Sequence, residues 1–344
     1  MSSEGFFPRQ PLPENVGTYF GPQLQRLDSR FDARRFFIRH FDPIRRTLER
    51  HRELGLAVLV FSDSPEPIVG HWIEARLDST TSCVLGRHSS CELYVGGAAP
   101  ELSLRHAVLA VRAMSFQSLR ARIFDLRTQF GFADENGRDL RGVTIDGTSF
   151  FRFGDLIVLA LVTGEDPSSF SSAQDAYDAL PPRVFVDALQ AAPTDPRFRV
   201  LSPRGFGAHE GECTSVRSQL AVLPPDAELL GPDEVPEGRL YLTTSSGRRF
   251  VREVGPAALS RGLLFGRYER CDIGRAGGEQ ELSRVHLLIV KDRGELIAID
   301  TASSNGSFTG GRQIRQVRMQ CGMELDLGGS LSVKWVSGAA EADG

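Results

Sequence analysis

The sequence contains few cysteines, very few lysines and no long apolar run. Its five cysteines are odd in number and never stand in a C-x-x-C spacing, which argues against a disulfide framework and against a cysteine-rich zinc site. Only Lys291 and Lys334 are lysines among the 40 basic residues, so arginine is too common for any single one to indicate a function. The longest apolar runs, such as 56–61 and 156–162, are far below the roughly 20 residues of a membrane span.

An excess of charge of one sign is also missing. The chain has 40 basic and 44 acidic residues, a formal net charge of −4, which supports neither a nucleic-acid-binding protein nor a polybasic membrane anchor. The first four residues lack the basic start and apolar run of a signal peptide. We therefore expect a cytoplasmic protein without nucleic-acid or membrane partners. The length of 344 residues predicts two globular domains.

Short apolar runs separated by turn residues predict an all-β fold, because many short strands at such spacing are typical of sandwiches. The predicted strands are 56–61, 73–77, 83–86, 93–95, 107–111, 121–126 and 156–162, followed by 240–243, 263–266, 285–290, 296–300, 307–309, 324–327 and 331–336.

Two regions between and before the strands have a different composition. Asp42-Pro43 is a typical helix start and predicts a short helix over 43–53. In residues 164–237, frequent prolines and serines indicate a linker, with short helices expected at 173–180 and 184–191. The predicted organisation is an N-terminal extension (1–54), a sandwich (55–163), a Pro-rich, partly helical linker (164–237), a second sandwich (238–337) and a tail (338–344).

The two β-rich halves are related by an internal repeat. A shift of 180 residues without a gap converts one set of residues into a second set of the same types: Gly86, Arg87, Cys91, Leu102, Ser103 and His106 become Gly266, Arg267, Cys271, Leu282, Ser283 and His286. After the histidines the first copy carries a net insertion, because His106 and Asp125 stand farther apart than His286 and Asp300. Such a repeat indicates two copies of one fold.

Three motifs of the second half follow one another at strand ends: Gly266-Arg267, then Ser283-Arg284-Val285-His286, then Ser304-Asn305-Gly306. In this order and spacing they resemble the forkhead-associated (FHA) domain family. The resemblance covers residues 238–337 and implies an 11-stranded sandwich that binds phosphothreonine peptides. It assigns Arg267 and Ser283 to the phosphothreonine, Asn305 to the peptide backbone, and Arg284 and Ser304 to the rim. Gly266 and His286 have architectural roles in the family.

The residue types alone also suit a phosphate site. Arg267 offers a planar fork for bidentate contact, and Ser283 offers a hydroxyl donor. Asn305 can pair with a peptide backbone, and Gly306 suits a turn with positive φ. Each residue also has a plain alternative: a solvated surface arginine, a hydrogen-bonded structural histidine at 286, or an ordinary hairpin turn at 305–306. One departure from the family pattern is Gly310-Gly311, where a second Asn-Gly is frequent.

The first half keeps only part of the pattern. Arg87, Ser103 and Arg105 leave a possible vestigial anion site. The position equivalent to Asn305, counted from Asp125, is Phe130, which cannot clasp a peptide backbone. Asn136-Gly137 is a conceivable substitute, but its acidic neighbours would repel phosphate. We therefore interpret the first sandwich as a diverged FHA-like copy.

No enzyme motif is found in the sequence. It lacks a G-x-x-x-x-G-K-[ST] loop, a G-x-S-x-G elbow and an H-E-x-x-H pair. The stretch 209–213 places potential metal ligands close together, but we interpret it as a solvated polar segment of the linker. No catalytic residue, metal site or cofactor is predicted.

The favoured function is a phosphothreonine-dependent adaptor whose partners are substrates of a Ser/Thr kinase or the kinase itself. The alternative is a phosphate-independent scaffold that uses both sandwiches for assembly; the residues leave the oligomeric state open. A further hypothesis is self-regulation. Thr163 precedes an acidic pair in a segment expected to be exposed, and a phosphate there would compete for Arg267 and Ser283.

Overall fold

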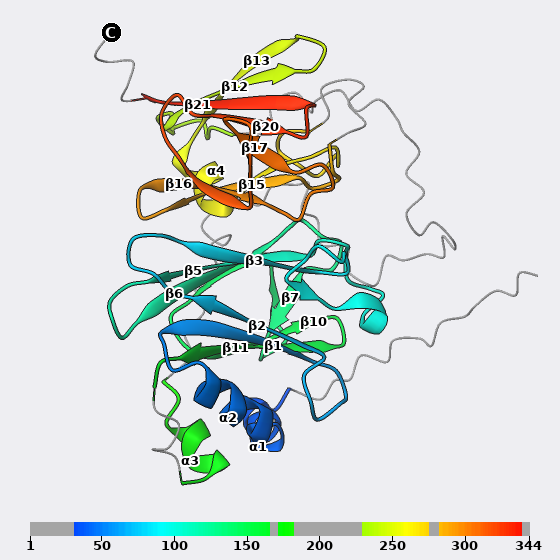
Figure 1. The fold of residues 1–344 in the computed structure, drawn as a ribbon, viewed down its shortest axis with the longest axis vertical. Coiled ribbons are helices and arrows are strands. Elements are labelled where there is room, and N and C mark those ends of the chain that lie inside the picture. The colour runs from blue at the N-terminus through cyan, green and yellow to red at the C-terminus, as the bar shows by residue number, and fades with distance from the viewer. Residues whose placement is uncertain (1–30, 166–170, 182–228, 275–281, 339–344) are drawn as a thin grey trace, which may run out of the picture. The chain divides into compact units, whose positions relative to one another are not determined.

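The structure, a computed structural model, describes residues 31–165, 171–181, 229–274 and 282–338, and is drawn in Figure 1. Within these residues, strands arranged in four sheets, with only a few short helices, confirm the predicted all-β fold class. None of the helices in the described ranges is long and apolar enough to cross a membrane. The helix predicted at 184–191 and the polar stretch at 209–213 lie outside the described residues.

The first sandwich contains β1 (Gly55–Phe61), β2 (Val69–Glu74), β3 (Thr81–Gly86), β4 (Leu93–Tyr94), β5 (Ala107–Ala113), β6 (Leu119–Asp125), β7 (Phe132–Asp134), β8 (Asp139–Leu140), β9 (Gly142–Ile145), β10 (Ser149–Phe153) and β11 (Leu156–Thr163). One sheet has the order β2-β1-β11-β10-β7-β8 and the other β4-β3-β5-β6-β9. Neighbouring strands are antiparallel except β3 and β4.

The second sandwich contains β12 (Gly238–Thr244), β13 (Arg249–Val254), β14 (Leu263–Phe265), β15 (Leu287–Asp292), β16 (Glu295–Asp300), β17 (Ser307–Thr309), β18 (Arg312–Ile314), β19 (Gln316–Met319), β20 (Glu324–Leu327) and β21 (Leu331–Ser337). Its sheets have the orders β13-β12-β21-β20-β17-β18 and β14-β15-β16-β19. These orders repeat those of the first sandwich, except that a single parallel bridge between Phe265 and Ile273 stands in the place of β4. The sequence repeat is therefore also a repeat of topology. The inserted residues lengthen the hairpin β5–β6, whose connection is 114–118, whereas β15 and β16 are joined by 293–294 alone.

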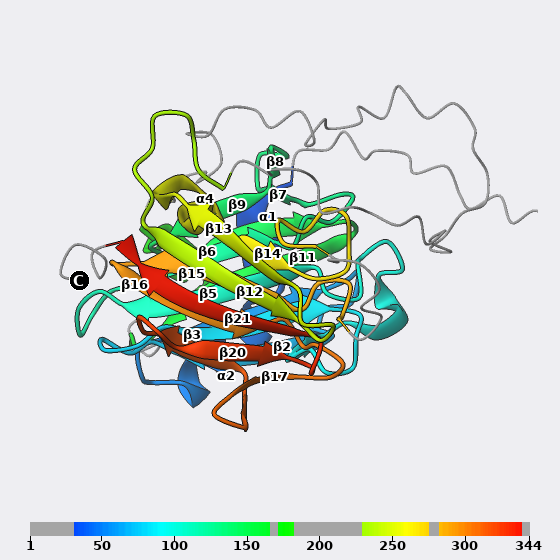
Figure 2. The same ribbon diagram turned by 90° about the horizontal axis from the view of Figure 1, so that it is seen from above.

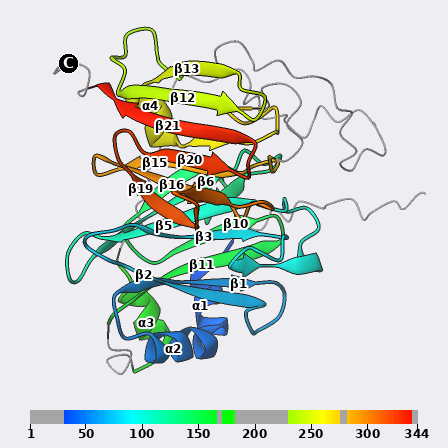
Figure 3. The same cartoon turned by 45° about the horizontal axis from the view of Figure 1, so that its top comes forward.

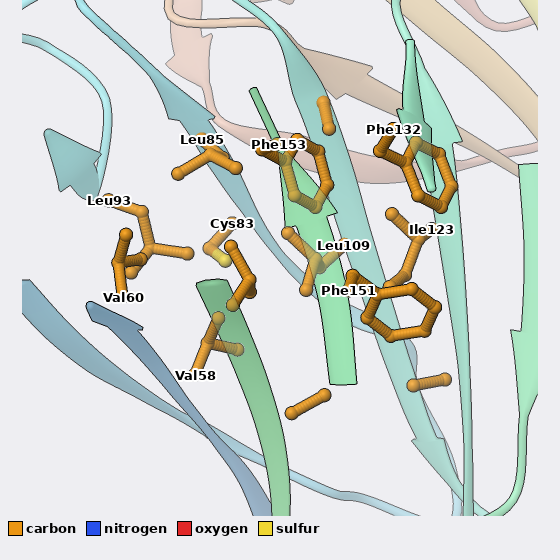
Figure 4. Close-up of a cluster of buried hydrophobic side chains, with 14 of the residues drawn as sticks. Val58, Val60, Cys83, Leu85, Leu93, Leu109, Ile123, Phe132, Phe151 and Phe153 are labelled. Atoms are coloured by element: carbon orange, nitrogen blue, oxygen red, sulfur yellow. The ribbon is translucent and has the colours of Figure 1, made fainter. Parts of the chain in front are cut away.

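Strand β1 shows why its sequence is a continuous apolar run rather than an alternating one. All its residues are buried, because both faces of its sheet are covered. Val58 and Val60 point into the core between the two sheets, where Figure 4 shows them with Leu109 and Phe151. The alternate residues, such as Phe61, pack on the other side against helices.

The helices that cover this outer face are α1 (Ala33–Arg39), α2 (Phe41–Arg50) and α3 (Ala173–Asp178), beside β1 and β11 in Figure 1. The predicted helix at 43–53 therefore exists but begins earlier, with His40 rather than Asp42 before its first residue. His40 also ends α1, so this one residue separates the two helices. Pro43 is tolerated because the N–H groups of a first turn have no helical partner.

The two sandwiches pack face to face through β3, β5 and β6 of the first and β14, β15 and β16 of the second. Figure 3 shows the two sandwiches stacked, and in Figure 2 the second is seen lying over the first. The whole of β5 is buried, although the outer face of a free antiparallel sheet is normally solvated. Its outward residues Val108 and Ala110 form a third apolar cluster with Leu288 and Val290. Both sandwiches belong to one compact unit. The predicted boundaries of the two domains, 55–163 and 238–337, stay a proposal.

Thr163 does not lie in an exposed segment as predicted. It ends β11 with 1% of its surface exposed. Its hydroxyl donates to the carbonyl of Glu53 at 2.8 Å and accepts from Trp72 Nε1 at 3.1 Å. A kinase cannot reach a hydroxyl buried and bonded in this way, so the self-regulation hypothesis is wrong for this residue.

Candidate functional site

His286 joins two loops at one end of the second sandwich. The side chain is fully buried. Its Nδ1 lies 3.2 Å from the backbone nitrogen of Ser283, and its Nε2 lies 3.0 Å from the carbonyl oxygen of Gly306. Because the Ser283 N–H can only donate, Nδ1 accepts and Nε2 carries the proton. Burial lowers the pKa of His286, which favours this neutral form.

The carboxylate of Asp300 shapes the loop that follows β16. It accepts hydrogen bonds from the backbone N–H and the hydroxyl of Ser303, at 2.7 and 2.6 Å, and from the hydroxyl of Ser307 at 2.6 Å. Within this turn Ala302 has a φ of 60°, a conformation that residues with a Cβ atom rarely adopt. The loop is therefore held in an unfavourable backbone conformation by its hydrogen bonds.

The hydroxyl of Ser283 is where the two loops meet. Its Oγ accepts a hydrogen bond from the Ser304 backbone N–H at 2.9 Å. Ser283 itself is largely buried, with 6% of its surface exposed. No described residue accepts its own proton, so the hydroxyl can still donate to a ligand that reaches it. Ser304 and Asn305 are exposed beside it. Ser304 and Asn305 therefore form the outer surface of the loop pair.

Gly266 allows the end of β14 to pass directly below the Ser283 loop. A Cβ atom at this glycine would lie 2.3 Å from the carbonyl oxygen of Arg284. The next residue, Arg267, donates its backbone N–H to the Ser283 carbonyl at 3.0 Å. Its side chain is exposed, and no described residue forms a hydrogen bond or ion pair with its guanidinium group. Arg284 is half-buried on the same loop as Ser283.

A further part of the site was not predicted from the sequence. The turn between β20 and β21 closes against Asn305, since a Cβ atom at Gly328 would lie 2.8 Å from the Asn305 Cβ and 3.4 Å from His286 Cε1. Gly328 and Gly329 both have positive φ values, 62° and 72°. The paired glycines before the last strand were the available signal for this turn.

Together these loops offer an exposed guanidinium group, a free hydroxyl proton and an exposed amide side chain. The first two suit an anion with several acceptor oxygens, and the amide can pair with an extended backbone. The described ranges contain no group of His, Cys, Asp and Glu side chains that could hold a metal ion. A surface hollow of about 690 Å³ lies elsewhere, against Glu324 and Asp326, whose carboxylates would repel an anion.

The corresponding end of the first sandwich has the same internal frame. His106 Nδ1 lies 3.2 Å from the Ser103 nitrogen, and His106 Nε2 lies 2.8 Å from the carbonyl oxygen of Gly131. Gly131 therefore corresponds to Gly306, and the residue before it, Phe130, corresponds to Asn305. Phe130 is 56% exposed, so an aromatic ring stands where the second sandwich presents an amide.

The other recognition positions of the first sandwich also differ. The Nε of Arg87 donates to the carbonyl of Leu102 within its own loop, whereas the Arg267 guanidinium is exposed. Leu104 occupies the position of Arg284 and is exposed. Asn136 lies in the turn between β7 and β8, where its backbone N–H donates to Asp134 Oδ1 at 2.9 Å. It does not replace the missing asparagine of this loop.

Arg105 does not belong to an anion site of the first sandwich, contrary to the prediction. Only 7% of its surface is exposed, and its Nε donates to the carbonyl of Ala302 in the second sandwich at 2.8 Å. The side chain is directed across the interface because β5 and the residues before it face the second sandwich. Of the three predicted residues, Arg87 and Ser103 remain at the end of the first sandwich.

Comparison with known proteins finds a family model that matches the segment holding this site. The model of the FHA domain matches residues 263–328. The FHA-1 domain of Rv1747 from Mycobacterium tuberculosis is 24% identical with a TM-score of 0.24, over 30% of this chain and 99% of that one. The FHA domain of CT664 from Chlamydia trachomatis is 22% identical with a TM-score of 0.24, over 29% of this chain and 97% of that one. No curated relative is detected. Residues 263–328, which hold Arg267, Ser283 and Asn305, thus match the FHA domain family.

Proposed function

We propose that the second sandwich binds phosphothreonine peptides and that the protein is a non-catalytic, cytoplasmic adaptor in Ser/Thr kinase signalling. The observation that carries this proposal is the unsatisfied donor set at the loop ends. The Arg267 guanidinium is exposed without a partner among the described residues, and the Ser283 hydroxyl, oriented by the Ser304 N–H, keeps its proton. Donors held ready in this way favour a ligand that brings its own acceptors.

A phosphate group on a peptide fits this donor set. It adds a charge of about −1.5 to −2 and three strong acceptor oxygens. Arg267 and Ser283 would contact the phosphate, with Arg284 and Ser304 at the rim. Asn305 would pair with the backbone of the peptide, since its amide has both a donor and an acceptor. Gly266, His286 and Gly306 would support the site without touching the ligand.

The partners would be proteins that a Ser/Thr kinase has phosphorylated, or the kinase itself. Arg267, Ser304 and Asn305 are exposed at the end of the sandwich, and we expect them to recognise a few residues of extended chain rather than a folded surface. Modification of the partner would then control association, because the unphosphorylated peptide offers the two donors no anionic acceptor.

A phosphate-independent scaffold is the second candidate, and the first sandwich favours it. One of its faces is covered by α1 and α2 and another by the second sandwich. The exposed end carries Phe130 and Leu104 in the positions of Asn305 and Arg284. Such a unit would serve assembly rather than phosphate recognition.

Binding of matched peptides by the full chain separates the two candidates. A phosphothreonine peptide selected from a library and its unphosphorylated form would be titrated by calorimetry. We expect binding of the phosphorylated form alone, and Ser283→Ala to weaken it while Ser103→Ala, its counterpart in the first sandwich, does not. Equal affinity for both peptides, or failure of every phosphopeptide to bind, would support the scaffold instead.

A further inference from the structure

We propose that Arg105 of the first sandwich is a positioning residue for the peptide-binding loop of the second; this inference rests on the proposed function. Its Nε and Nη2 both donate to the carbonyl of Ala302, at 2.8 and 2.5 Å, and Nη2 lies 3.4 Å from Ser304 Oγ. Ala302 and Ser304 lie in the loop that presents Asn305. The binding site is therefore completed by a residue from the other sandwich.

The contact fixes one peptide unit from both sides. The Ala302 carbonyl and the Ser303 N–H belong to the same planar unit. Arg105 holds the carbonyl, and the Asp300 carboxylate accepts from the N–H at 2.7 Å. This unit follows a residue with a φ of 60°, which would otherwise favour a different backbone conformation. The next N–H, that of Ser304, is thereby directed at Ser283 Oγ.

Burial makes the contact hard to replace. Arg105 is 7% exposed, and a buried charge requires hydrogen-bond partners. The Ala302 carbonyl is one of these partners. The Asp300 carboxylate and the Arg284 guanidinium are also close enough to influence Arg105 electrostatically. Its positive charge thus lies against the loop that carries Ser304 and Asn305, where the Asp300 carboxylate partly balances it.

A weaker contact of the same kind, from an arginine of one sandwich to a loop carbonyl of the other, occurs at the equivalent place of the first sandwich. Arg127 corresponds to Ala302 and also has a positive φ, 55°. Its carbonyl accepts from Arg270 of the second sandwich at 3.1 Å. Arg270 is exposed and makes this contact through one nitrogen, whereas Arg105 is buried and uses two. The stronger of the two contacts therefore supports the loop that carries the donor set.

The test compares two arginines of the interface in the full chain. Arg122 is the matched control, because it also donates from the first sandwich to backbone carbonyls of the second, at Lys291 (2.8 Å) and Ser260, but near the far end of β15. The probe is a labelled phosphothreonine peptide that the wild-type chain selects from a library. Affinity is measured by anisotropy, and amide hydrogen exchange at Ser303 and Ser304 reports the loop.

We expect Arg105→Met to weaken the peptide about tenfold or more and to accelerate exchange at both serines, while Arg122→Met changes affinity less than twofold. Arg105→Lys, which keeps the charge, should recover part of the loss. If Arg105→Met does not fold, Arg105→Gln, which keeps one donor, is measured in the same way. Affinity and exchange unchanged from wild type, or shifted equally by the Arg122 variant, would overturn the inference. Absence of binding by the wild-type chain would instead remove the proposed function, and the inference with it.

Discussion

The two sandwiches share the buried histidine that joins their loops, which we call the frame, and differ in the side chains exposed on those loops. His106 and His286 make the same two hydrogen bonds, with Nδ1 distances of 3.2 Å in both and Nε2 distances of 2.8 and 3.0 Å. The residues displayed on that frame are unlike. Asn305 is replaced by Phe130, and the counterpart of the open Arg267 is bound to its own loop.

This comparison separates architecture from recognition. The histidine and the glycines set the distance between loops in both copies, so their presence does not indicate binding. Recognition depends on the few exposed side chains between them. A change to the histidine or the glycines should therefore affect equivalent loops of both sandwiches alike, whereas a change to the exposed side chains should affect binding only in the second.

The largest effect is expected from the matched pair Gly86→Ala and Gly266→Ala. In both, the new Cβ atom would lie 2.3 Å from a backbone carbonyl oxygen, that of Leu104 or Arg284. Because a backbone atom rather than a side chain must move, each should lower the free energy of unfolding by about 3 kcal/mol. Only Gly266→Ala should also abolish phosphopeptide binding. Urea unfolding and calorimetry test both parts, and a much milder loss in one variant would show that the frames are not equivalent.

The pair Arg267→Ala and Arg87→Ala tests the role of the exposed side chains in recognition. Hydrogen bonds to a charged group contribute about 1.5–3 kcal/mol, so Arg267→Ala should weaken a phosphothreonine peptide at least about tenfold. Arg87→Ala should leave affinity unchanged, because its Nε is already bound to the Leu102 carbonyl. Arg293→Ala, an exposed arginine at the other end of β15, is a control for the loss of charge. Equal losses of phosphopeptide affinity in all three variants would show that the effect comes from the change in net charge and not from a contact with Arg267.

The buried histidines should make stability depend on pH in both sandwiches. Burial lowers the pKa of His106 and of His286 below the ordinary 6.5. As the pH falls below 6.5, the histidines of the unfolded chain take up protons before those of the folded chain. The stabilising contribution of the neutral, buried histidines is therefore fully present above pH 6.5 and is lost as the pH falls toward their folded pKa values. Denaturation at pH 7.5 and 5.5 should show this loss, and His106→Gln or His286→Gln should each reduce it. A loss of the same size in both variants and wild type would assign it to other groups.

Much of the fold was predictable because the cores of both sandwiches give short apolar runs. The strands β1, β5, β11 and β15 coincide with such runs. Strand β13 was missed, since its residues are largely exposed and polar and resemble a loop. The strands β7 and β8 were missed because they are only a few residues long.

The site was predictable where it depends on local motifs and not where it depends on packing. Counting from Asp125 identified Phe130 as the counterpart of Asn305, and the histidine contacts give the same correspondence. The destination of Arg105 was not predictable, because it requires knowledge of which faces the two sandwiches bury against each other. Thr163 was misplaced for a similar reason, since its burial depends on Trp72 and Glu53.

The smallest effect is expected from restoring the missing amide with Phe130→Asn. The ring is 56% exposed, so stability should change by no more than about 0.5 kcal/mol. The variant should not gain phosphopeptide binding when the second sandwich is silenced by Arg267→Ala. Arg87 remains bound to Leu102, and Leu104 still occupies the arginine position, so the amide alone has no phosphate contacts to support. Adding Leu104→Arg should give weak binding at most. If Phe130→Asn alone restored tight binding in calorimetry, recognition would depend on the amide more than on the arginines. The role of Arg267 as the main phosphate contact would then be wrong.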